Sequence, residues 1–371
     1  MTSKPETAVG DESPMRYELR EARNGRRIGF AILNRPRQLN ALNLAMCESM
    51  LAQLRAWASD ESIAAVVLAG AGDKGFCPGG DVAEVIRQVR GGQPDRFVYG
   101  DTFFTVEYEL DYLLHTYPKP LVSYSHGINM GGGVGLSVGA SHRVVAEGSR
   151  IAMPEIHIGL FPDVGGGWFL NRTPGGTGAL MALTGLTINE ADAIFAGLAD
   201  FFVPLESRDA LYEGLADIDW QGGAADFTAV TRLLMSYHQR YHAGLPASSL
   251  RQYFDAIRFI GAQPDVIAAR DALLAAARED DFFARPAESL AGGSPTAAHV
   301  TWAYLKRCRH LSLREVLDLD LVLARQYQRR HDFPEGVRAL LIDKDRRPAW
   351  SPDRFEAVDS DLVEAHFHPL R

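Results

Sequence analysis

Short apolar runs alternate with segments of helical periodicity over the first half of this chain. Five such runs predict buried strands. The predicted strands are residues 28–33, 64–69, 121–125, 143–146 and 151–153. Residues 43–58 and 103–114 lie between them and repeat their apolar positions at helical spacing. Strands separated by crossovers of helical length predict a layered α/β core.

The pattern changes after about residue 204. Residues 266–278 and 311–330 are predicted to be helical, with little strand character between them. The Gly- and Pro-containing stretch 291–296 breaks the periodicity and predicts the start of another helix near Ala297. The expected organisation has three parts, namely a disordered leader (residues 1–14), an α/β core (residues 15–204) and a helical C-terminal region (residues 205–371).

The composition is that of a globular protein and excludes some classes of partner. Of the 371 residues, 46% are hydrophobic and 23% are charged, which is enough to bury a substantial core. The net charge of −9 argues against a nucleic-acid partner, because phosphate binding needs a concentrated basic surface. The local pair Arg35 and Arg37 still allows a small anionic ligand. No apolar run approaches the ~20 residues of a membrane span, so no membrane partner is expected.

The cysteines and the first residues predict a location. Cys47, Cys77 and Cys308 form no CxxC pair, so neither a disulfide framework nor a zinc site is expected, and a reducing cytosol fits best. Residues 1–14 are polar and acidic, with Lys4 as their only basic residue, which is unlike a secretory signal or an Arg-rich transit peptide. We therefore expect a cytoplasmic location.

Two glycine clusters each follow a predicted strand and precede a predicted helix. The first, residues 75–81 (GFCPGGD), precedes residues 82–90, and the second, Gly131-Gly132-Gly133, precedes residues 134–140. Glycine lets backbone N–H groups approach a ligand closely, and the first N–H groups of a helix lack partners within it. Either cluster alone could be a tight turn. Together they favour one amide from each converging on a single oxygen, as in an oxyanion hole.

Two carboxylates follow the last predicted strand, eight positions apart. Glu155 and Asp163 have mostly apolar neighbours, so burial should raise the pKa of at least one of them. The alternatives are a surface or helix-start acid for Glu155 and the N-cap of a helix beginning near Gly166 for Asp163. Oxyanion donors beside acids that attack or activate water are the groups needed to cleave an acyl bond.

Other reactive side chains are weaker candidates. His126 and His157 each lie beside a predicted strand, where histidine is more often a hydrogen-bonded structural residue than a base. Cys77 has no His or Asp partner at a recognised spacing, so a small packed residue is expected there.

Several long motifs resemble the crotonase (enoyl-CoA hydratase/isomerase) superfamily, and more closely its 3-hydroxyisobutyryl-CoA hydrolase branch. The superfamily motifs are residues 34–42, 75–81 and 127–135, and the branch motifs are residues 152–155, 159–167 and 331–345. The resemblance covers nearly the whole chain after the leader. It implies a crotonase-like ββα spiral core followed by a mostly helical C-terminal region.

The resemblance also implies roles for individual residues. Gly80 and Gly132 would donate the two oxyanion-hole N–H groups to a thioester carbonyl. Glu155 would be the principal catalytic carboxylate, and Asp163 would hold the hydroxyl of the acyl group or the hydrolytic water. Glu107 matches a substrate-contacting glutamate of the branch. The residues expected along the path of coenzyme A are Arg37, Gln38, Leu39, Ala41, Pro78, Asp81 and Val82.

One departure from the wider superfamily bears on the reaction. Hydratases have a second catalytic glutamate three residues after the middle glycine of the triplet, and here that place is Gly135. Where hydratases carry glycine, this chain has Asp163. The exchange favours hydrolysis of a short 3-hydroxyacyl-CoA, above all 3-hydroxyisobutyryl-CoA, a step of valine catabolism. No metal or redox cofactor is expected, and coenzyme A enters only as part of the substrate.

Two alternatives remain at this point. One is an enoyl-CoA hydratase or isomerase that uses Glu155 as its single acid/base. The other is a non-catalytic acyl-CoA-binding protein. The presence of both Glu155 and Asp163 argues against it. The acyl preference depends on pocket shape, in which we expect Phe104, Trp168 and the C-terminal helices to take part. Superfamily members are commonly trimers or hexamers, so a homo-oligomer is possible, although the extended C-terminal region could cover the usual interface.

Overall fold

The computed structural model describes residues 13–370. Most of the predicted disordered leader therefore lies outside the described residues. Its last two residues, Ser13 and Pro14, accept hydrogen bonds of 2.9 Å through their carbonyls from the side chain and the backbone of Asn34. These contacts join the start of the described chain to the end of the second strand.

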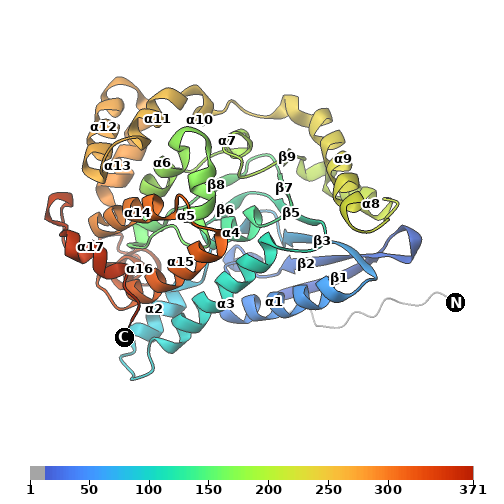
Figure 1. Cartoon of the computed structure of the whole chain (residues 1–371), viewed down its shortest axis with the longest axis horizontal. Coiled ribbons are helices and arrows are strands. Elements are labelled where there is room, and N and C mark those ends of the chain that lie inside the picture. Colours follow the sequence, from blue (N-terminus) through green and yellow to red (C-terminus); the bar gives the residue numbers. More distant parts are fainter. Residues whose placement is uncertain (1–12, 371) are drawn as a thin grey trace.

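A six-stranded sheet forms the centre of the molecule, in the order β1-β2-β3-β5-β7-β9 (Figure 1). Its strands are β1 (Met15–Glu21), β2 (Arg27–Leu33), β3 (Ile63–Gly70), β5 (Leu121–Ser125), β7 (His142–Val145) and β9 (Phe201–Phe202). Only β1 is antiparallel to its neighbour, and the other pairs are parallel. Four of the five predicted strands belong to this sheet, which confirms the α/β layering expected from helical crossovers.

A second, parallel sheet of three short strands lies beside the first. It consists of β4 (Gly75–Cys77), β6 (Ile128–Met130) and β8 (Arg150–Ala152). The predicted strand at residues 151–153 is thus real but belongs to this smaller sheet. Strands β4 and β6 were not predicted, because three residues are too few to show an alternating pattern. Each of the three strands leads directly into a loop of the candidate site.

Helices cover both faces of the large sheet (Figure 1). The predicted helices of the first half are α1 (Leu44–Ser59), α2 (Val82–Arg90), α3 (Val98–His115) and α4 (Gly132–Val138). Helix α4 begins two residues earlier than expected, so Gly132 is its first residue. On the opposite face, α8 (Arg208–Ala216) and α9 (Ala224–Tyr241) pack Leu211, Leu215 and Leu234 against strand residues such as Phe30 and Val67.

The chain is mostly helical after β8, and from α8 onward this agrees with the helical region predicted after about residue 204. Its helices are α5 (Gly166–Phe169), α6 (Thr177–Thr184), α7 (Glu190–Phe195), α8 (Arg208–Ala216), α9 (Ala224–Tyr241), α10 (Ser249–Gln252), α11 (Phe254–Gly261), α12 (Val266–Glu279), α13 (Ala284–Gly292), α14 (Pro295–Cys308), α15 (Leu313–Gln328), α16 (Asp332–Val337) and α17 (Ser360–His366). Ser294 caps α14 by accepting from the Ala297 amide at 3.0 Å. Within residues 13–370, no helix combines the length and apolar character needed to cross a bilayer.

The C-terminal helices and the α/β layers share one apolar core. Phe104 and Leu114 of α3, Tyr304 of α14 and Leu323 of α15 belong to the same buried cluster. Helix α15 lies along α3 (Figure 1), so it reinforces the helix that carries Glu107. The C-terminal region is therefore packed where it can shape the site.

Candidate active site

Three loops that leave the small sheet meet around one cavity of about 210 Å³. The loop after β4 contributes Gly80, the loop after β6 contributes Gly131 and Gly132, and the segment after β8 contributes Glu155. Parallel strands end at the same edge of a sheet, which is why residues distant in the sequence come together here. The wall also carries Glu107 and Asp163, together with Phe104, Leu340 and Leu341.

The two glycine clusters come close to each other at the cavity wall. A Cβ atom added at Gly132 would lie 3.4 Å from the Gly80 nitrogen and 2.7 Å from Glu107 Oε1. Across the described part of the chain, neither the Gly80 nor the Gly132 N–H donates a hydrogen bond to the protein. Gly132 opens α4, so its amide belongs to the unpaired first turn of that helix. The cavity thus has two free amide donors from separate loops.

Glu155 and Asp163 are both buried, each with 5% of its surface exposed. The surface-acid interpretation of Glu155 is therefore wrong. Asp163 is not an N-cap either, because Gly165 occupies that position before α5. Burial raises the pKa of Asp163 to about 6, against the opposing effect of a hydrogen bond from Tyr108. Burial, followed by the charge of Asp163, raises the pKa of Glu155 well above its usual range.

Glu107 approaches the same cavity from α3. It is 2% exposed, and its Oε1 has no hydrogen-bond partner among residues 13–370. Burial and then the charges of Asp163 and Glu155 raise the pKa of Glu107 well above its usual range. Burial and mutual repulsion oppose the ionisation of all three carboxyls at once, so the site holds protonated and ionised acids side by side. Such a site can both accept and donate a proton.

Three side chains around these acids were not identified from the sequence. The Tyr108 hydroxyl donates to Asp163 Oδ2 at 2.7 Å. Asp111 lies one turn beyond Glu107 on α3, is fully buried, and has no partner for either oxygen among the described residues. Asp320 of α15 accepts from the Gly165 amide at 2.8 Å. Helical spacing from Glu107 could have identified Asp111, whereas the other two depend on contacts between distant segments.

Of the residues predicted along the coenzyme A path, two line the cavity and the others do not. Pro78 and Val82 line the cavity. Asp81 instead faces the Arg35 guanidinium at 3.4 Å. The remaining predicted residues lie outside the cavity, in the 3-10 helix η2 (Pro36–Gln38) and just after it, and they are Arg37, Gln38, Leu39 and Ala41.

That outer segment still contacts the glycine loop through the backbone. The Leu42 amide donates to the Gly79 carbonyl at 2.9 Å, and the Asp81 amide donates to the Leu42 carbonyl at 2.6 Å. The segment therefore borders the loop that presents Gly80. A role of its side chains toward coenzyme A stays a prediction.

Both histidines make hydrogen bonds to other parts of the protein, and the cysteine is packed. His126 binds the Gly72 carbonyl at 3.0 Å, and His157 reaches the cavity wall but binds Ser289 Oγ at 2.6 Å. Cys77 is fully buried, and burial raises the pKa of its thiol to about 12, which opposes a nucleophilic role. Trp168, expected to shape the acyl pocket, does not line the cavity and packs against His115 instead.

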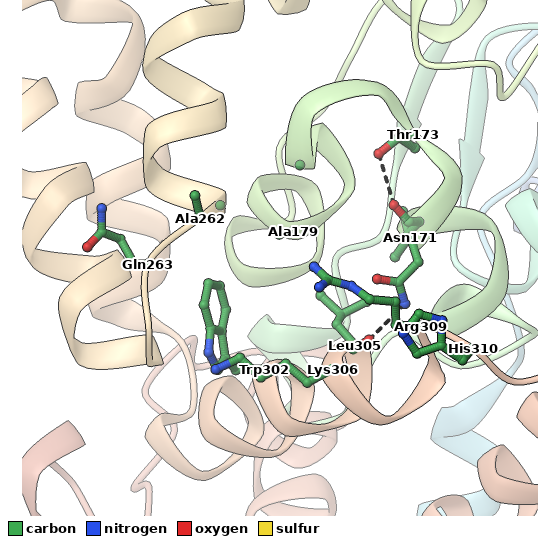
Figure 2. A pocket seen from close by; sticks show the side chains of 13 residues that line it. Asn171, Thr173, Ala179, Ala262, Gln263, Trp302, Leu305, Lys306, Arg309 and His310 are labelled. Atoms are coloured by element: carbon green, nitrogen blue, oxygen red, sulfur yellow. Dashed lines mark hydrogen bonds between the residues drawn. The ribbon is translucent and has the colours of Figure 1, made fainter.

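A larger cavity of about 520 Å³ lies elsewhere, between α6, α11 and α14 (Figure 2). Its described lining includes Lys306, Arg309 and His310 but no carboxylate. Its described lining therefore has basic groups without an acid beside them. The chemistry of the chain is therefore concentrated in the smaller cavity.

Two free glycine amides beside buried acids, at the ends of parallel strands, fit an enzyme that acts on an acyl group. The sequence agrees with this class. Residues 28–367 match the family described as Enoyl-CoA hydratase/isomerase, and the chain belongs to that family.

Relatives with assigned names place the chain more closely. It is 38% identical to "3-hydroxyisobutyryl-CoA hydrolase, mitochondrial" of Xenopus tropicalis, over 92% of this chain and 86% of that protein. The human protein of the same name is 36% identical over the same shares. "3-hydroxyisobutyryl-CoA hydrolase 1" of Arabidopsis thaliana is 36% identical, over 90% of this chain and 87% of the other. The predicted resemblance to this branch is confirmed.

Solved structures confirm the crotonase-like fold. A carnitinyl-CoA dehydratase from Mycobacterium thermoresistibile superposes with a TM-score of 0.83 at 34% identity, covering 95% of this chain and 96% of that one. An enoyl-CoA hydratase from Rhodobacter sphaeroides superposes with a TM-score of 0.82 at 36% identity, covering 95% and 97%.

The comparisons contradict the expected cytoplasmic location. The Xenopus and human relatives are named mitochondrial, so that prediction is wrong. Its basis was weak in physical terms. The three cysteines are buried and unpaired, and this does not single out the cytosol.

Proposed function

We propose that the protein hydrolyses the thioester of 3-hydroxyisobutyryl-CoA to 3-hydroxyisobutyrate and coenzyme A, a step of valine catabolism. The observation that carries the proposal is the placement of Glu155 and Asp163, buried together, beside the free amides of Gly80 and Gly132. The names of the relatives support the same reaction.

In the proposed mechanism the two glycine amides polarise the thioester carbonyl and stabilise the oxyanion that forms on it. Glu155 either attacks the carbonyl, which expels the coenzyme A thiolate and leaves a mixed anhydride that water then hydrolyses, or takes a proton from a water that attacks the carbonyl directly and displaces the thiolate. The thiolate takes up a proton on release. Asp163 binds the 3-hydroxyl of the acyl group, and a site built to bind a hydroxyl rejects analogues that lack it. These groups suffice for hydrolysis, so the proposal invokes neither a metal nor a redox cofactor.

A second candidate is hydration of an enoyl-CoA, because the solved structures with high TM-scores are titled as a dehydratase and a hydratase. Gly135 opposes this candidate, since it stands where the resemblance places a second catalytic glutamate. Without that acid, addition of water across a C=C bond lacks half of its acid/base machinery.

A thiol-release assay separates the candidates. The purified protein would be incubated with 3-hydroxyisobutyryl-CoA and with crotonyl-CoA, and both free thiol and enoyl absorbance would be followed. We expect rapid thiol release from the first compound and little change in the second. Loss of the enoyl absorbance of crotonyl-CoA without thiol release would support the hydratase instead. Tight binding of both compounds without turnover would support a non-catalytic binding protein.

A further inference from the structure

Val164, directly after Asp163, has a backbone conformation that its residue type disfavours. Its φ angle is +52°, and its side chain is 1% exposed. A branched Cβ makes the left-handed region especially unfavourable, and such strain persists only where the surrounding structure enforces it. The other described non-glycine residues with positive φ are Asn24, Leu39, Asn40, Lys344 and Arg346, none of which is β-branched.

The side chain of Val164 fills a space that exists because residue 135 is glycine. A Cβ atom added at Gly135 would lie 2.6 Å from Val164 Cβ and 2.8 Å from its Cγ2. The same atom would lie 3.2 Å from Asp111 Oδ1, so no free volume surrounds the contact. Gly135 is one turn beyond Gly132 on α4. The valine is therefore seated on the helix that presents one of the two oxyanion donors.

Hydrogen bonds fix the chain on both sides of Val164. On one side, Tyr108 donates to the Asp163 carboxylate at 2.7 Å. On the other, the Gly165 amide donates to Asp320 at 2.8 Å, and the Gly166 amide returns to the Asp163 carbonyl at 2.7 Å. The strained residue thus lies between two anchored ends, where its rotation would directly turn Asp163.

We propose that Val164 is a positioning residue and that Gly135 is its socket, the pair directing Asp163 at the 3-hydroxyl of the acyl group. This inference rests on the proposed function, because it specifies how that site selects a hydroxylated substrate. Val164 itself takes no part in the chemistry.

The first test compares substrates with and without the hydroxyl. In V164G, glycine tolerates the positive φ but no longer fills the socket. We expect kcat/KM for 3-hydroxyisobutyryl-CoA to fall ~10²-fold, since a small misplacement of a catalytic group has effects of this size. Hydrolysis of isobutyryl-CoA should change far less, so the preference for the hydroxylated substrate falls. An equal loss on both substrates would indicate a merely structural role and would overturn the proposal.

The second test is a double-mutant cycle. An added methyl group at a helical glycine ordinarily stabilises a helix, whereas in G135A it collides with Val164. We therefore expect G135A to lose hydroxyl preference in the wild-type background. In V164G it should lose little further, or recover some preference, because the new methyl group refills the socket. Additive effects of the two substitutions would overturn the pairing.

Two further variants keep the test decisive. N24G relaxes a positive φ of +61° in the exposed turn between β1 and β2 and should leave the preference unchanged. V164A retains Cβ, so it provides an intermediate case if V164G does not fold. If the wild-type protein releases no thiol, the proposed function fails. The present inference can then be tested alone by calorimetric binding of two non-hydrolysable thioether analogues, one of 3-hydroxyisobutyryl-CoA and one of isobutyryl-CoA. Equal affinities of the wild-type protein for both thioethers would reject it.

Discussion

The hydroxyl of Tyr108 donates a hydrogen bond of 2.7 Å to Asp163, in a place where both side chains are buried. The donor favours the ionised carboxylate and so counteracts the burial that raises the pKa of Asp163 to about 6. The tyrosine therefore keeps part of the acid ionised near neutral pH.

Replacing Tyr108 with phenylalanine should move the pH dependence of the reaction. Without the donor, the pKa of Asp163 rises further above 6. As the pH is lowered, Asp163 is then protonated at a higher pH, and any step that needs its ionised form is lost there. We expect the acidic limb of a kcat/KM profile to shift upward by roughly one unit, the size of one charge-assisted hydrogen bond. Y117F is a matched control, because Tyr117 donates to the Leu54 carbonyl away from the cavity. An unchanged limb would contradict this role of Tyr108.

Gly132 should not tolerate a side chain. In G132A the new methyl group would lie 2.7 Å from Glu107 Oε1 and 3.4 Å from the Gly80 nitrogen, which is the space proposed for the oxyanion. We expect kcat to fall by ~10²–10³-fold, the effect of removing one oxyanion donor. Steady-state kinetics would measure it. Gly292 has open space around it, so G292A should keep full activity.

Glu155 should be indispensable for turnover. In E155Q the amide can neither attack the carbonyl nor accept a proton, so we expect kcat to fall at least ~10³-fold. A buried glutamate outside the cavity, Glu190, provides the control variant E190Q. Single-turnover hydrolysis in ¹⁸O-water would then separate the two proposed routes, because only the anhydride route transfers label into Glu155. Near-normal thiol release by E155Q would remove Glu155 from the mechanism.

Asp111 should make the protein less stable as the pH rises. Burial, followed by the charge of Glu107, raises its pKa well above the usual value. The folded state then holds a proton that the unfolded chain releases near pH 4, so the free energy of unfolding falls with rising pH until the folded pKa is passed. In D111N the amide resembles the protonated acid and does not titrate. We expect the free energy of unfolding of D111N to decline less steeply with pH than that of the wild-type protein. At pH 8 it should be higher by about 1.4 kcal/mol for each unit of pKa shift that the substitution removes.

Urea unfolding of D111N and wild type at several pH values between 4.5 and 8 would measure this difference. Asp318 on α15 is exposed, so D318N should leave the pH dependence as in the wild type. Parallel stability curves for D111N and the wild-type protein would show that the pKa of Asp111 is the same in the folded and unfolded states, and would contradict the raised pKa.

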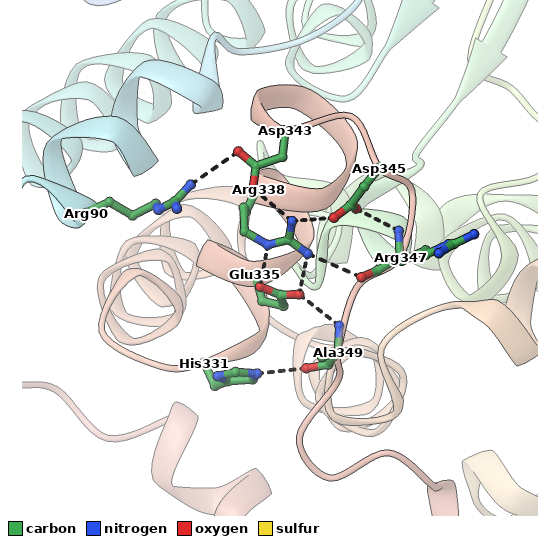
Figure 3. Close-up of polar contacts among 8 residues, drawn as sticks. All are labelled: Arg90, His331, Glu335, Arg338, Asp343, Asp345, Arg347 and Ala349. Atoms are coloured by element: carbon green, nitrogen blue, oxygen red, sulfur yellow. Dashed lines mark hydrogen bonds and ion pairs between the residues drawn. The ribbon is translucent and has the colours of Figure 1, made fainter.

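A hub of ion pairs around Arg338 fixes the C-terminal segment that closes the cavity (Figure 3). The guanidinium donates to both Glu335 oxygens at 2.8 Å and to Asp343 and Asp345 at 2.9 and 2.6 Å. Leu340 and Leu341, which lie between these partners, line the cavity. Loss of the hub should therefore loosen the cavity wall without touching the acids.

We expect R338M to raise KM by up to roughly fivefold with kcat nearly unchanged, because exposed ion pairs contribute modestly. High salt should reproduce part of the effect in the wild-type protein, because it screens exposed charges. R270M is the control, since Arg270 pairs with Asp271 and Glu356, none of which lines the cavity. A fall in kcat with unchanged KM would contradict this account.

Much of the fold could be predicted because its signals are local. The apolar runs that became β2, β3 and β5 are long enough to show their burial, and Ser294-Pro295 marks the start of α14 by its cap chemistry. Strands β4 and β6 escaped prediction because three residues in a glycine-rich stretch show no period. Their hydrogen-bond partners lie far away in the sequence, so only the assembled sheet reveals them.

The sequence by itself determined which chemistry is available. Glycines at two strand-to-helix junctions, followed by Glu155 and Asp163, specify donors and acids through residue type and spacing. Only the tertiary structure decided that these groups share one cavity, that Tyr108 binds Asp163, and that Val164 packs against Gly135. The reason is that local propensity acts over a few residues, whereas burial, pKa shifts and strain depend on atoms brought together by packing.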